Sequence, residues 1–272
     1  MKIQSKNHYD NSDDYLQFVH KVKKKTSIDL SMYKEAQMKR RLRSFFEKKN
    51  FSSFQEFYDR GLDKDEAILT EFLEKMTINV SEFFRNQKRW EVLTKKIFPR
   101  LLKDNSELKI WSAACSTGEE PYTLSIILDQ YRGCKSHSIL ATDIDEAILL
   151  RAAKGLFTER ALKKLPKEEI QKHFVKETAG YRVRDSLKKC ITFKKHNLLR
   201  DVYEPEHDLI VCRNVLIYFT EEAKHSIYRR FNKALKMGGV LFVGSTEQIF
   251  NPIRYGFETE DTFFYKKIKD IE

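Results

Sequence analysis

The stretch LKIWSAACSTGEEPY, residues 108–122, decides the fold. It joins a short apolar run to a turn of small residues, and it continues into Glu119, Glu120 and Pro121. Acidic residues and proline favour the first turn of a helix. The stretch therefore predicts a β-strand that ends in a tight turn and leads directly into an α-helix.

Four further runs rich in β-branched and aliphatic residues follow along the chain, most of them before a helical pattern. They are HSILATDI (137–144), CITFKKHN (190–197), HDLIVCRN (207–214) and GGVLFVGS (238–245). Strands that alternate with helices and read as nearly continuous apolar runs indicate a parallel sheet covered on both faces. We therefore predict a doubly wound α/β domain over residues 87–272.

The interval between the second and third of these strands is too long for a simple crossover connection. Within it, HFVKE (173–177) and YRVRD (181–185) flank Thr178, Ala179 and Gly180. Two short strand-like runs around a glycine-containing turn are typical of a β-hairpin. We predict that residues 156–190 form a small inserted subdomain with antiparallel strands.

Residues 1–86 show helical periodicity throughout and no strand-like alternation. A helix that starts near Ser31 carries Met38, Leu42, Phe45 and Phe46 on one apolar stripe. The sequence therefore predicts a small all-α N-terminal domain with a linker, ending near residue 86.

The chain has 272 residues and a formal net charge of +11, with 41% hydrophobic and 12% aromatic residues. This composition predicts a globular protein, and the basic excess implies a partner that is a nucleic acid, an anionic membrane or an acidic protein. Its apolar runs fall far short of the roughly 20 residues that a membrane-spanning helix needs. Its start, MKIQSKNHYDNSDD, has no apolar stretch typical of a secretory signal. We expect a cytoplasmic protein without membrane insertion.

The motifs disfavour metal ions and pyrophosphate cofactors. The four cysteines form no CxxC pair and none of the seven histidines pairs at HxxxH spacing, so we expect no metal. The turn at 112–121 lacks GxGxxG, and its paired glutamates would repel a pyrophosphate. A glutamate there suits a ligand with a cationic amino group, although the turn could also be a plain strand-to-helix connection.

Polar residues that follow the second and third strands fit an adenosine. Asp143 ends the second strand, where an acid can accept the ribose hydroxyls, whereas Asp145 is better placed as the N-cap of the next helix. A capping role for Asp143 itself is the alternative. After the third strand, Asn197 and Leu198 suit the edge and face of an adenine. The sequence therefore favours an adenosine-type ligand without a pyrophosphate.

Several motifs in this order resemble the chemotaxis receptor methyltransferase family (CheR type). They are TINVSEFFR (77–85), SAACSTGEEPY (112–122), ATDID (141–145), HNLL (196–199), CRNVLIYF (212–219) and LKMGGVLFVGSTE (235–247). The resemblance implies a Rossmann-like domain that transfers a methyl group from S-adenosylmethionine to glutamate side chains of chemoreceptors, leaving S-adenosylhomocysteine. It implies that the cofactor site is lined by Asn79, Ser81, Arg85, Glu119 or Glu120, Asp143, Asn197, Leu198, Arg213 and Asn214.

The chemistry of a glutamate acceptor agrees with these residues. Its carboxylate, with a pKa of about 4.3, is already ionised at pH 7 and needs orientation rather than a general base. Tyr218 and Arg85 are donors that could hold it, and the resemblance implies that both lie near the methyl group. The alternatives are a packed strand-end aromatic for Tyr218 and a surface salt bridge for Arg85.

A basic face on the second helix supplies the expected receptor contact. Lys39, Arg40 and Arg43 project on one side of its apolar stripe, where a glutamate-rich methylation helix of a chemoreceptor would be attracted. A face that is only solvated is the alternative. A nucleic-acid methyltransferase is disfavoured because no aromatic residues interleave these charges and RNVLIY (213–218) replaces the NPPY-like motif of amino methyltransferases. A non-catalytic receptor-binding adaptor is the third hypothesis.

Overall fold

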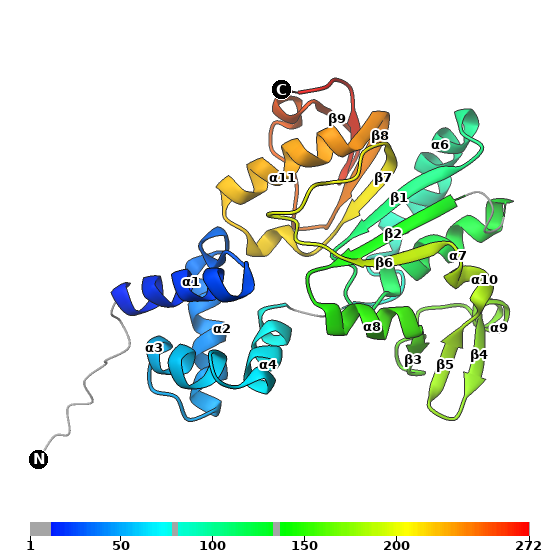
Figure 1. Cartoon of the computed structure of the whole chain (residues 1–272). Coiled ribbons are helices and arrows are strands. Elements are labelled where there is room, and N and C mark those ends of the chain that lie inside the picture. The colour runs from blue at the N-terminus through cyan, green and yellow to red at the C-terminus, as the bar shows by residue number, and fades with distance from the viewer. Residues whose placement is uncertain (1–11, 78–80, 133–136, 272) are drawn as a thin grey trace, which may run out of the picture. The chain divides into compact units, whose positions relative to one another are not determined.

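The computed structural model describes residues 12–77, 81–132 and 137–271. They cluster into two compact units (Figure 1). The helical unit comprises Met1–Ile78 and Tyr218–Ala223, and the sheet unit comprises Asn79–Ile217 and Lys224–Glu272. Residues 81–86, which the sequence analysis groups with the helical part, cluster with the sheet unit.

The helical unit is built from short helices around aromatic side chains. Its elements are α1 (Ser12–Thr26), η1 (Leu30–Met32), α2 (Glu35–Lys48), α3 (Phe54–Glu56), η2 (Phe57–Leu62) and α4 (Glu66–Met76). Phe18, Phe46 and Phe57 are fully buried, and the rings of Phe18 and Phe46 each have their centroid 5.8 Å from that of Phe57. The predicted stripe on α2 faces this core, since Met38, Leu42, Phe45 and Phe46 are all buried.

Helix starts in this unit follow local capping. The Ser53 side chain accepts the Glu56 N–H at the start of α3. Asp65 caps α4 by accepting the Ala67 N–H. Helix α2 begins at Glu35 rather than near Ser31, because the chain first forms a turn of 3₁₀ helix and then an extended residue, Tyr33, that bridges to Phe219.

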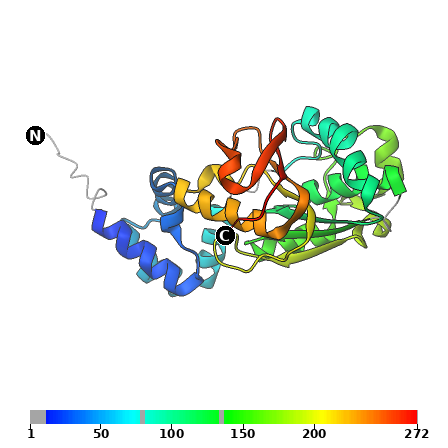
Figure 2. The same ribbon diagram turned by 90° about the horizontal axis from the view of Figure 1, so that it is seen from above.

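The sheet unit contains a seven-stranded sheet in the order β6-β2-β1-β7-β8-β10-β9. The strands are β1 (Leu108–Ala113), β2 (His137–Asp143), β6 (Ile191–Lys195), β7 (His207–Cys212), β8 (Leu235–Val243), β9 (Phe257–Asp261) and β10 (Phe264–Lys267). The first five pair in parallel, which confirms the predicted strands. The hairpin β9-β10, antiparallel to β8, was not predicted; Figures 1 and 2 show it in red at one edge.

Helices precede and connect these strands. They are α5 (Gln87–Val92), η3 (Leu93–Ile97), α6 (Phe98–Asp104), α7 (Glu119–Arg132), α8 (Glu146–Lys154) and α11 (Glu221–Ala234), with 3₁₀ turns η5 (Leu216–Tyr218) and η6 (Pro252–Tyr255). The core lies on the strands, where Ile110, Leu209 and Val240 are fully buried, each burial contributing about 1.5–3 kcal/mol. No helix in the described ranges is long and apolar enough to span a bilayer.

The predicted insertion forms its own three-stranded antiparallel sheet, in the order β3-β5-β4. Its elements are β3 (Leu156–Phe157), α9 (Lys167–His173), β4 (Phe174–Glu177), β5 (Gly180–Val183) and α10 (Asp185–Lys188). Glu177 pairs with Gly180, so the predicted hairpin is confirmed with a two-residue turn. The short β3 was not predicted. It passes so close to Gly180 that a Cβ there would lie 2.4 Å from the Phe157 carbonyl oxygen.

Candidate active site

The candidate site lies at the carboxyl ends of the central strands. The strand order places β1 between β2 and β7, so the chain winds in opposite directions from this point. Ligands of open α/β sheets bind beyond the carboxyl ends of the strands at such a switch point. The turns after β1, β2, β6, β7 and β8 are therefore the elements that build the site.

The turn after β1 is tied to the end of β2. Ala114 and Ser116 have positive φ angles of 63° and 50°, a conformation that costs non-glycine residues free energy. The Cys115 N–H donates to the Thr142 carbonyl at 2.8 Å, and the Ser116 N–H donates to Asp143 Oδ2 at 2.9 Å. These bonds hold the unusual backbone in place beside the acid that ends β2.

Three carboxyl groups gather around this turn. Glu119 and Asp143 are each 6% exposed, and Glu120 is largely buried. Burial, followed by the charges of Asp143, Glu120 and Glu119, raises the pKa of the Cys115 thiol. A cluster of carboxyl groups of this kind suits a ligand that carries positive charge.

Burial also changes how readily these acids ionise. It raises the pKa of Asp143 to about 6, although the N–H groups of Asp145 and Ser116 oppose the shift. Burial likewise raises the pKa of Glu120, against the opposing charge of Arg213. A bound cation would stabilise both ionised carboxylates, so the site gains from a cationic ligand.

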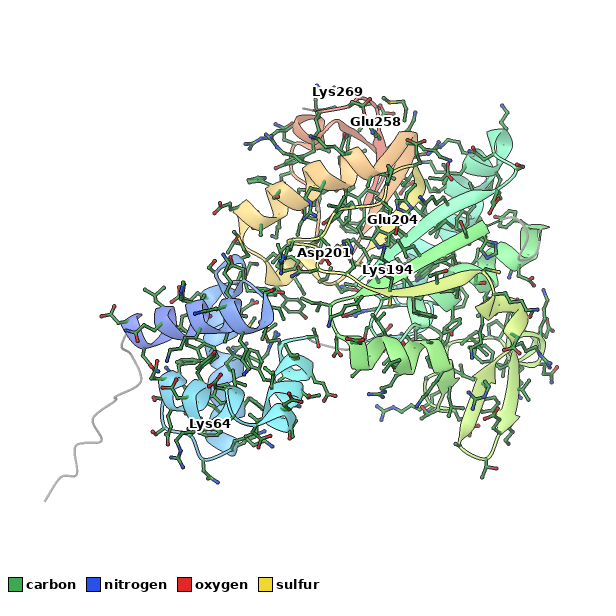
Figure 3. All side chains as sticks on the ribbon, in the orientation of Figure 1. Lys64, Lys194, Asp201, Glu204, Glu258 and Lys269 are labelled. Carbon is green, nitrogen blue, oxygen red and sulfur yellow. The ribbon has the colours of Figure 1, made fainter. Side chains whose placement is uncertain are left out.

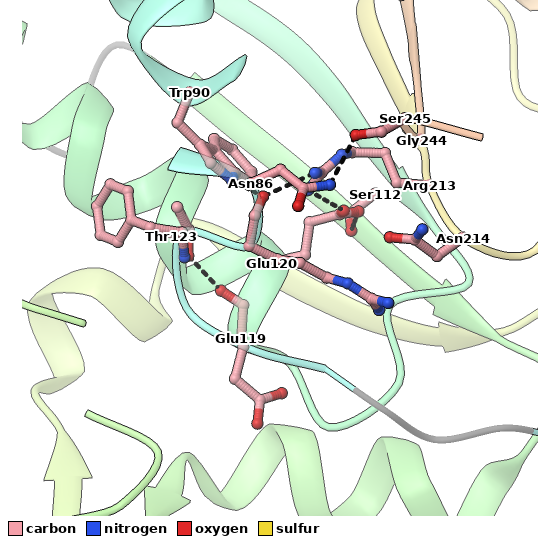
Figure 4. Close-up of polar contacts among 12 residues, drawn as sticks. Asn86, Trp90, Ser112, Glu119, Glu120, Thr123, Arg213, Asn214, Gly244 and Ser245 are labelled. Atoms are coloured by element: carbon pink, nitrogen blue, oxygen red, sulfur yellow. Dashed lines mark hydrogen bonds and ion pairs between the residues drawn. The ribbon is translucent and has the colours of Figure 1, made fainter. Parts of the chain in front are cut away.

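Arg213 is held by the protein on several sides. Its Nη2 donates to the Arg85 carbonyl at 2.7 Å, and its Nη1 lies 3.6 Å from Glu120 Oε2. The guanidinium lies over the rings of Trp90 and Phe242, 5.1 and 4.7 Å from their centroids. The Trp90 indole also donates to the Arg85 carbonyl, at 2.9 Å (Figure 4). In this structure Arg213 anchors the Arg85 backbone and faces Glu120.

The segment 81–86 is tied to both α7 and the loop after β8. The Phe84 N–H donates to Thr123 Oγ1 at 3.3 Å, and that hydroxyl donates to the Glu119 carbonyl at 2.6 Å. The Asn86 side chain donates to Ser245 Oγ at 2.7 Å (Figure 4). The first two of these bonds hold the segment against the start of α7. Ser81 and Arg85 are each half-buried, and the predicted Asn79 lies outside the described residues.

The two aspartates after β2 have different contacts. Asp145 accepts the Ile148 N–H at 3.1 Å and caps α8, as predicted. Asp143 instead accepts the Ser116 N–H on one oxygen and the Asp145 N–H, at 3.1 Å, on the other. A carboxylate has about four acceptor sites, so accepting a ribose hydroxyl stays chemically open to Asp143 and remains a prediction.

The turn after β6 is organised by its own polar groups. The side-chain oxygen of Asn197 accepts the Leu199 N–H at 2.9 Å, and the Asn197 N–H donates to Asp201, labelled in Figure 3, at 2.8 Å. Leu198 is buried, and its carbonyl accepts the Tyr203 hydroxyl at 2.8 Å. The adenine contacts of Asn197 and Leu198 stay predictions, now on a turn with a defined conformation.

Glu247 is a buried acid that the sequence reasoning missed, although its motif GSTE was quoted. One of its oxygens accepts the N–H groups of Asn214 and Gly244, at 2.7 and 2.8 Å. The other accepts the Ile217 N–H at 3.2 Å. Burial raises its pKa, and these N–H groups oppose the shift. The signal in the sequence was an acid three residues beyond the glycine that follows the fifth strand.

Tyr218 clusters with the helical unit, whereas Arg85 belongs to the sheet unit. The Tyr218 carbonyl accepts the Lys34 N–H at 2.8 Å, and the Arg41 guanidinium lies 5.2 Å from the centre of the Tyr218 ring. The side chain is half-buried at the end of η5 and is not a strand-end core aromatic. The joint action of Tyr218 and Arg85 on one carboxylate therefore stays a prediction.

Basic side chains of α2 line two depressions on the helical unit. One, of about 430 Å³, is lined by Ala36, Lys39, Arg40, Arg43, Ser44 and Glu47, so the three predicted cations share it. The other, of about 580 Å³, is lined by Gln37, Arg40, Arg41, Ser44, Phe45, Lys48, Lys75 and Tyr218. Lys39 pairs with Glu35 at 2.6 Å and lies over the Tyr15 ring, whereas Arg40 is exposed. Sequence reasoning missed Arg41, Lys48 and Lys75.

Within residues 12–77, 81–132 and 137–271, no group of three or more His, Cys, Asp or Glu side chains is arranged to hold a metal ion.

Known proteins resemble both units. The family model described as "CheR methyltransferase, all-alpha domain" matches residues 13–77, and "CheR methyltransferase, SAM binding domain" matches 79–264. A chemotaxis protein methyltransferase of Listeria innocua is 49% identical over 255 residues, 93% of this chain and 97% of that one. The one from Borreliella burgdorferi is 36% identical over 251 residues, 87% and 88% of the two chains. Chemotaxis protein methyltransferase 1 of Pseudomonas aeruginosa is 33% identical over 242 residues, 85% and 88%.

Proposed function

The chain belongs to the CheR methyltransferase family, and from that premise we propose that it methylates glutamate side chains of chemoreceptors. It is an S-adenosylmethionine-dependent methyltransferase of chemotaxis. The proposed products are glutamyl methyl esters and S-adenosylhomocysteine. The observation that carries the proposal is the group of buried carboxyls, Glu119, Glu120 and Asp143, at the strand ends of the matched domain.

The residues at the strand ends fit S-adenosylmethionine. When bound, this cofactor supplies a reactive methyl group on a positively charged sulfonium. Carboxyl groups in excess over the guanidinium groups of Arg85 and Arg213 favour such a charge. In this proposal Asp143 accepts the ribose hydroxyls and Glu119 or Glu120 faces the amino group.

The remaining cofactor contacts in the proposal come from the surrounding turns. Asn197 and Leu198 contact the adenine, while Asn79, Ser81 and Asn214 supply polar groups around the rest of the molecule. The contacts of Arg213 support a different task from the one first expected, because its Nη2 already donates to the Arg85 carbonyl. We assign Arg213 to holding Arg85 and balancing Glu120.

The acceptor glutamate needs orientation and no general base, because its carboxylate is ionised at pH 7. The proposal assigns this task to the Tyr218 hydroxyl and the Arg85 guanidinium, both of which donate hydrogen bonds. Two donors would hold the carboxylate without abolishing its nucleophilicity. The anchoring of the Arg85 carbonyl by Trp90 and Arg213 supports a fixed position for this arginine.

The proposed protein partner is the acidic methylation helix of a chemoreceptor, which also places the enzyme in the cytoplasm. The larger of the two depressions beside α2, of about 580 Å³, supports an acidic partner. It is lined by four cations and by no carboxylate: Arg40, Arg41, Lys48 and Lys75. Cations arranged in this way attract a glutamate-rich surface and raise its rate of encounter. The proposal involves neither nucleic acid nor insertion into a membrane.

Methyl labelling tests this function directly. The chain is incubated with S-adenosylmethionine labelled in its methyl group and a cytoplasmic fragment of a chemoreceptor. Labelled fragment that releases methanol in alkali is the expected result, because esters hydrolyse there and N-methyl groups do not. A fragment whose candidate glutamates are changed to glutamine is the control. Label that survives alkali, or that appears on added nucleic acid instead, contradicts the proposal.

A further inference from the structure

The loops that follow β7 and β8 meet on the carboxylate of Glu247. This side chain is 5% exposed and accepts three backbone N–H groups: from Asn214 at 2.7 Å, Gly244 at 2.8 Å and Ile217 at 3.2 Å. All three donors are main-chain groups, so the carboxylate sets the path of the backbone. We call these four residues the Glu247 clasp.

The clasp leaves no room for a side chain at Gly244. A Cβ there would lie 2.3 Å from Glu247 Oε2 and 2.9 Å from the Asn214 nitrogen. The glycine is therefore required by the close approach of the carboxylate and the loop after β7. Asn214 itself has a φ of 63°, a left-handed conformation that the Glu247 hydrogen bond helps to hold.

A carboxylate suits this position better than its neutral analogue. It offers two oxygens that only accept, which matches donors arriving on both sides. A glutamine has one such oxygen, and its NH₂ group would face a backbone N–H. Replacing Glu247 with glutamine therefore removes at least one hydrogen bond and makes the new NH₂ group face a backbone N–H, so that two donors meet. The side-chain volume changes little.

We propose that Glu247 is a positioning residue for the methyl-donor site. It acts through the backbone of Asn214, whose side chain the proposed function places against the donor, and the inference rests on that assignment. It also fixes Ile217, the residue directly before Tyr218 in the chain. Glu247 itself touches neither the donor nor the acceptor in this proposal.

The test compares donor-site affinity among variants of the full chain. S-adenosylhomocysteine binding is measured by calorimetry at a temperature well below the unfolding midpoint of each variant, where a loss of stability alone leaves affinity unchanged. Glu247→Gln is expected to bind about tenfold more weakly, the equivalent of one lost well-placed contact. The control is Glu258→Gln on β9, labelled in Figure 3, an exposed acid paired with Lys266 that should bind like the wild type.

A double variant shows whether Glu247 acts through Asn214. If it does, Asn214→Ala with Glu247→Gln binds no more weakly than the weaker single variant, because the positioned group is already absent. Additive losses, or unchanged affinity in a folded Glu247→Gln, overturn the proposal. Should Glu247→Gln not fold, Glu247→Asp takes its place: its shorter carboxylate cannot reach all three donors and must also weaken binding. Failure of the wild type to label a receptor would contradict the proposed acceptor and leave this result standing.

Discussion

The basic face of the helical unit and the strand-end site of the sheet unit hold their charges in opposite ways. In the helical unit, pairs such as Lys49 and Glu71, 2.7 Å apart, lie partly in solvent, and the cations around α2 line open depressions. In the sheet unit, Glu120 and Asp143 are buried at the strand ends, and burial raises the pKa of both. Exposed charges are hydrated and screened by salt. A buried carboxylate has lost its water, so its ionised form is stabilised only by the charges and hydrogen-bond donors around it. Changes to the buried carboxyl groups should therefore have larger effects than changes to the exposed cations.

Tyr218 is the exception to this comparison, and its substitution should have the largest effect. It clusters with the helical unit and is nevertheless assigned to the chemistry. Tyr218→Phe should lower kcat by about a hundredfold through loss of one orienting donor, and should change donor affinity little. Steady-state kinetics with calorimetry of S-adenosylhomocysteine binding checks this. Tyr58→Phe, another half-buried tyrosine of that unit, is the control. An equal loss in donor affinity would move Tyr218 to cofactor binding.

Asp143 tests the buried side of the comparison. Asp143→Ala should weaken binding of both S-adenosylmethionine and S-adenosylhomocysteine by about 1.5–3 kcal/mol, because a charge-assisted hydrogen bond is lost. Calorimetry measures it, with Glu146→Ala on α8, an exposed acid paired with Lys195, as the control. Unchanged affinity in a folded Asp143→Ala would exclude this acid from the site.

Donor binding should depend on pH through the same group. Ribose hydroxyls donate to the ionised carboxylate, and burial raises the pKa of Asp143 to about 6, so this form is present at pH 7.5 and scarce at pH 5. Affinity should therefore fall as the pH drops through 6, by about tenfold between pH 7.5 and 5. Asp143→Asn should bind more weakly and show a flatter profile. A wild-type affinity that is constant over this range would contradict the assignment.

The basic face should show the smallest effect. Arg40→Glu with Arg43→Glu should raise the apparent KM for receptor about threefold to tenfold and leave donor affinity intact, since exposed pairs are worth about 0–1 kcal/mol each. The variant should also be less sensitive to added salt, because the screened charges are gone. Lys24→Glu with Lys64→Glu makes the same charge change at two other exposed lysines of the unit, of which Figure 3 labels Lys64. If both double variants raise the KM equally, the basic face contributes only to the general attraction between a positively charged unit and an acidic receptor, and it is not a specific contact.

Local signals in the sequence predicted most of the fold. Five parallel strands, the inserted hairpin, the Asp145 cap and the stripe on α2 all depend on residues within a few positions of one another. The hairpin β9-β10 was missed because β9, FETED, is mostly charged and lacks an apolar run. The short β3 was missed because two residues carry no periodicity; its pairing with β5 alone makes it a strand.

For the candidate site, too, some features follow from the sequence and others only from the tertiary structure. The sequence by itself determined the family, the two-part architecture and the acids at the ends of the first two strands, because motif order and turn chemistry are local properties of the chain. Only the tertiary structure decided that Arg213 donates to the Arg85 carbonyl, 128 residues away in the sequence. The same holds for Glu247, which accepts the N–H of Asn214, 33 residues away. The physical reason is burial: away from water, each polar group must find its partner wherever the fold brings one, and local sequence does not encode which distant segment will supply it.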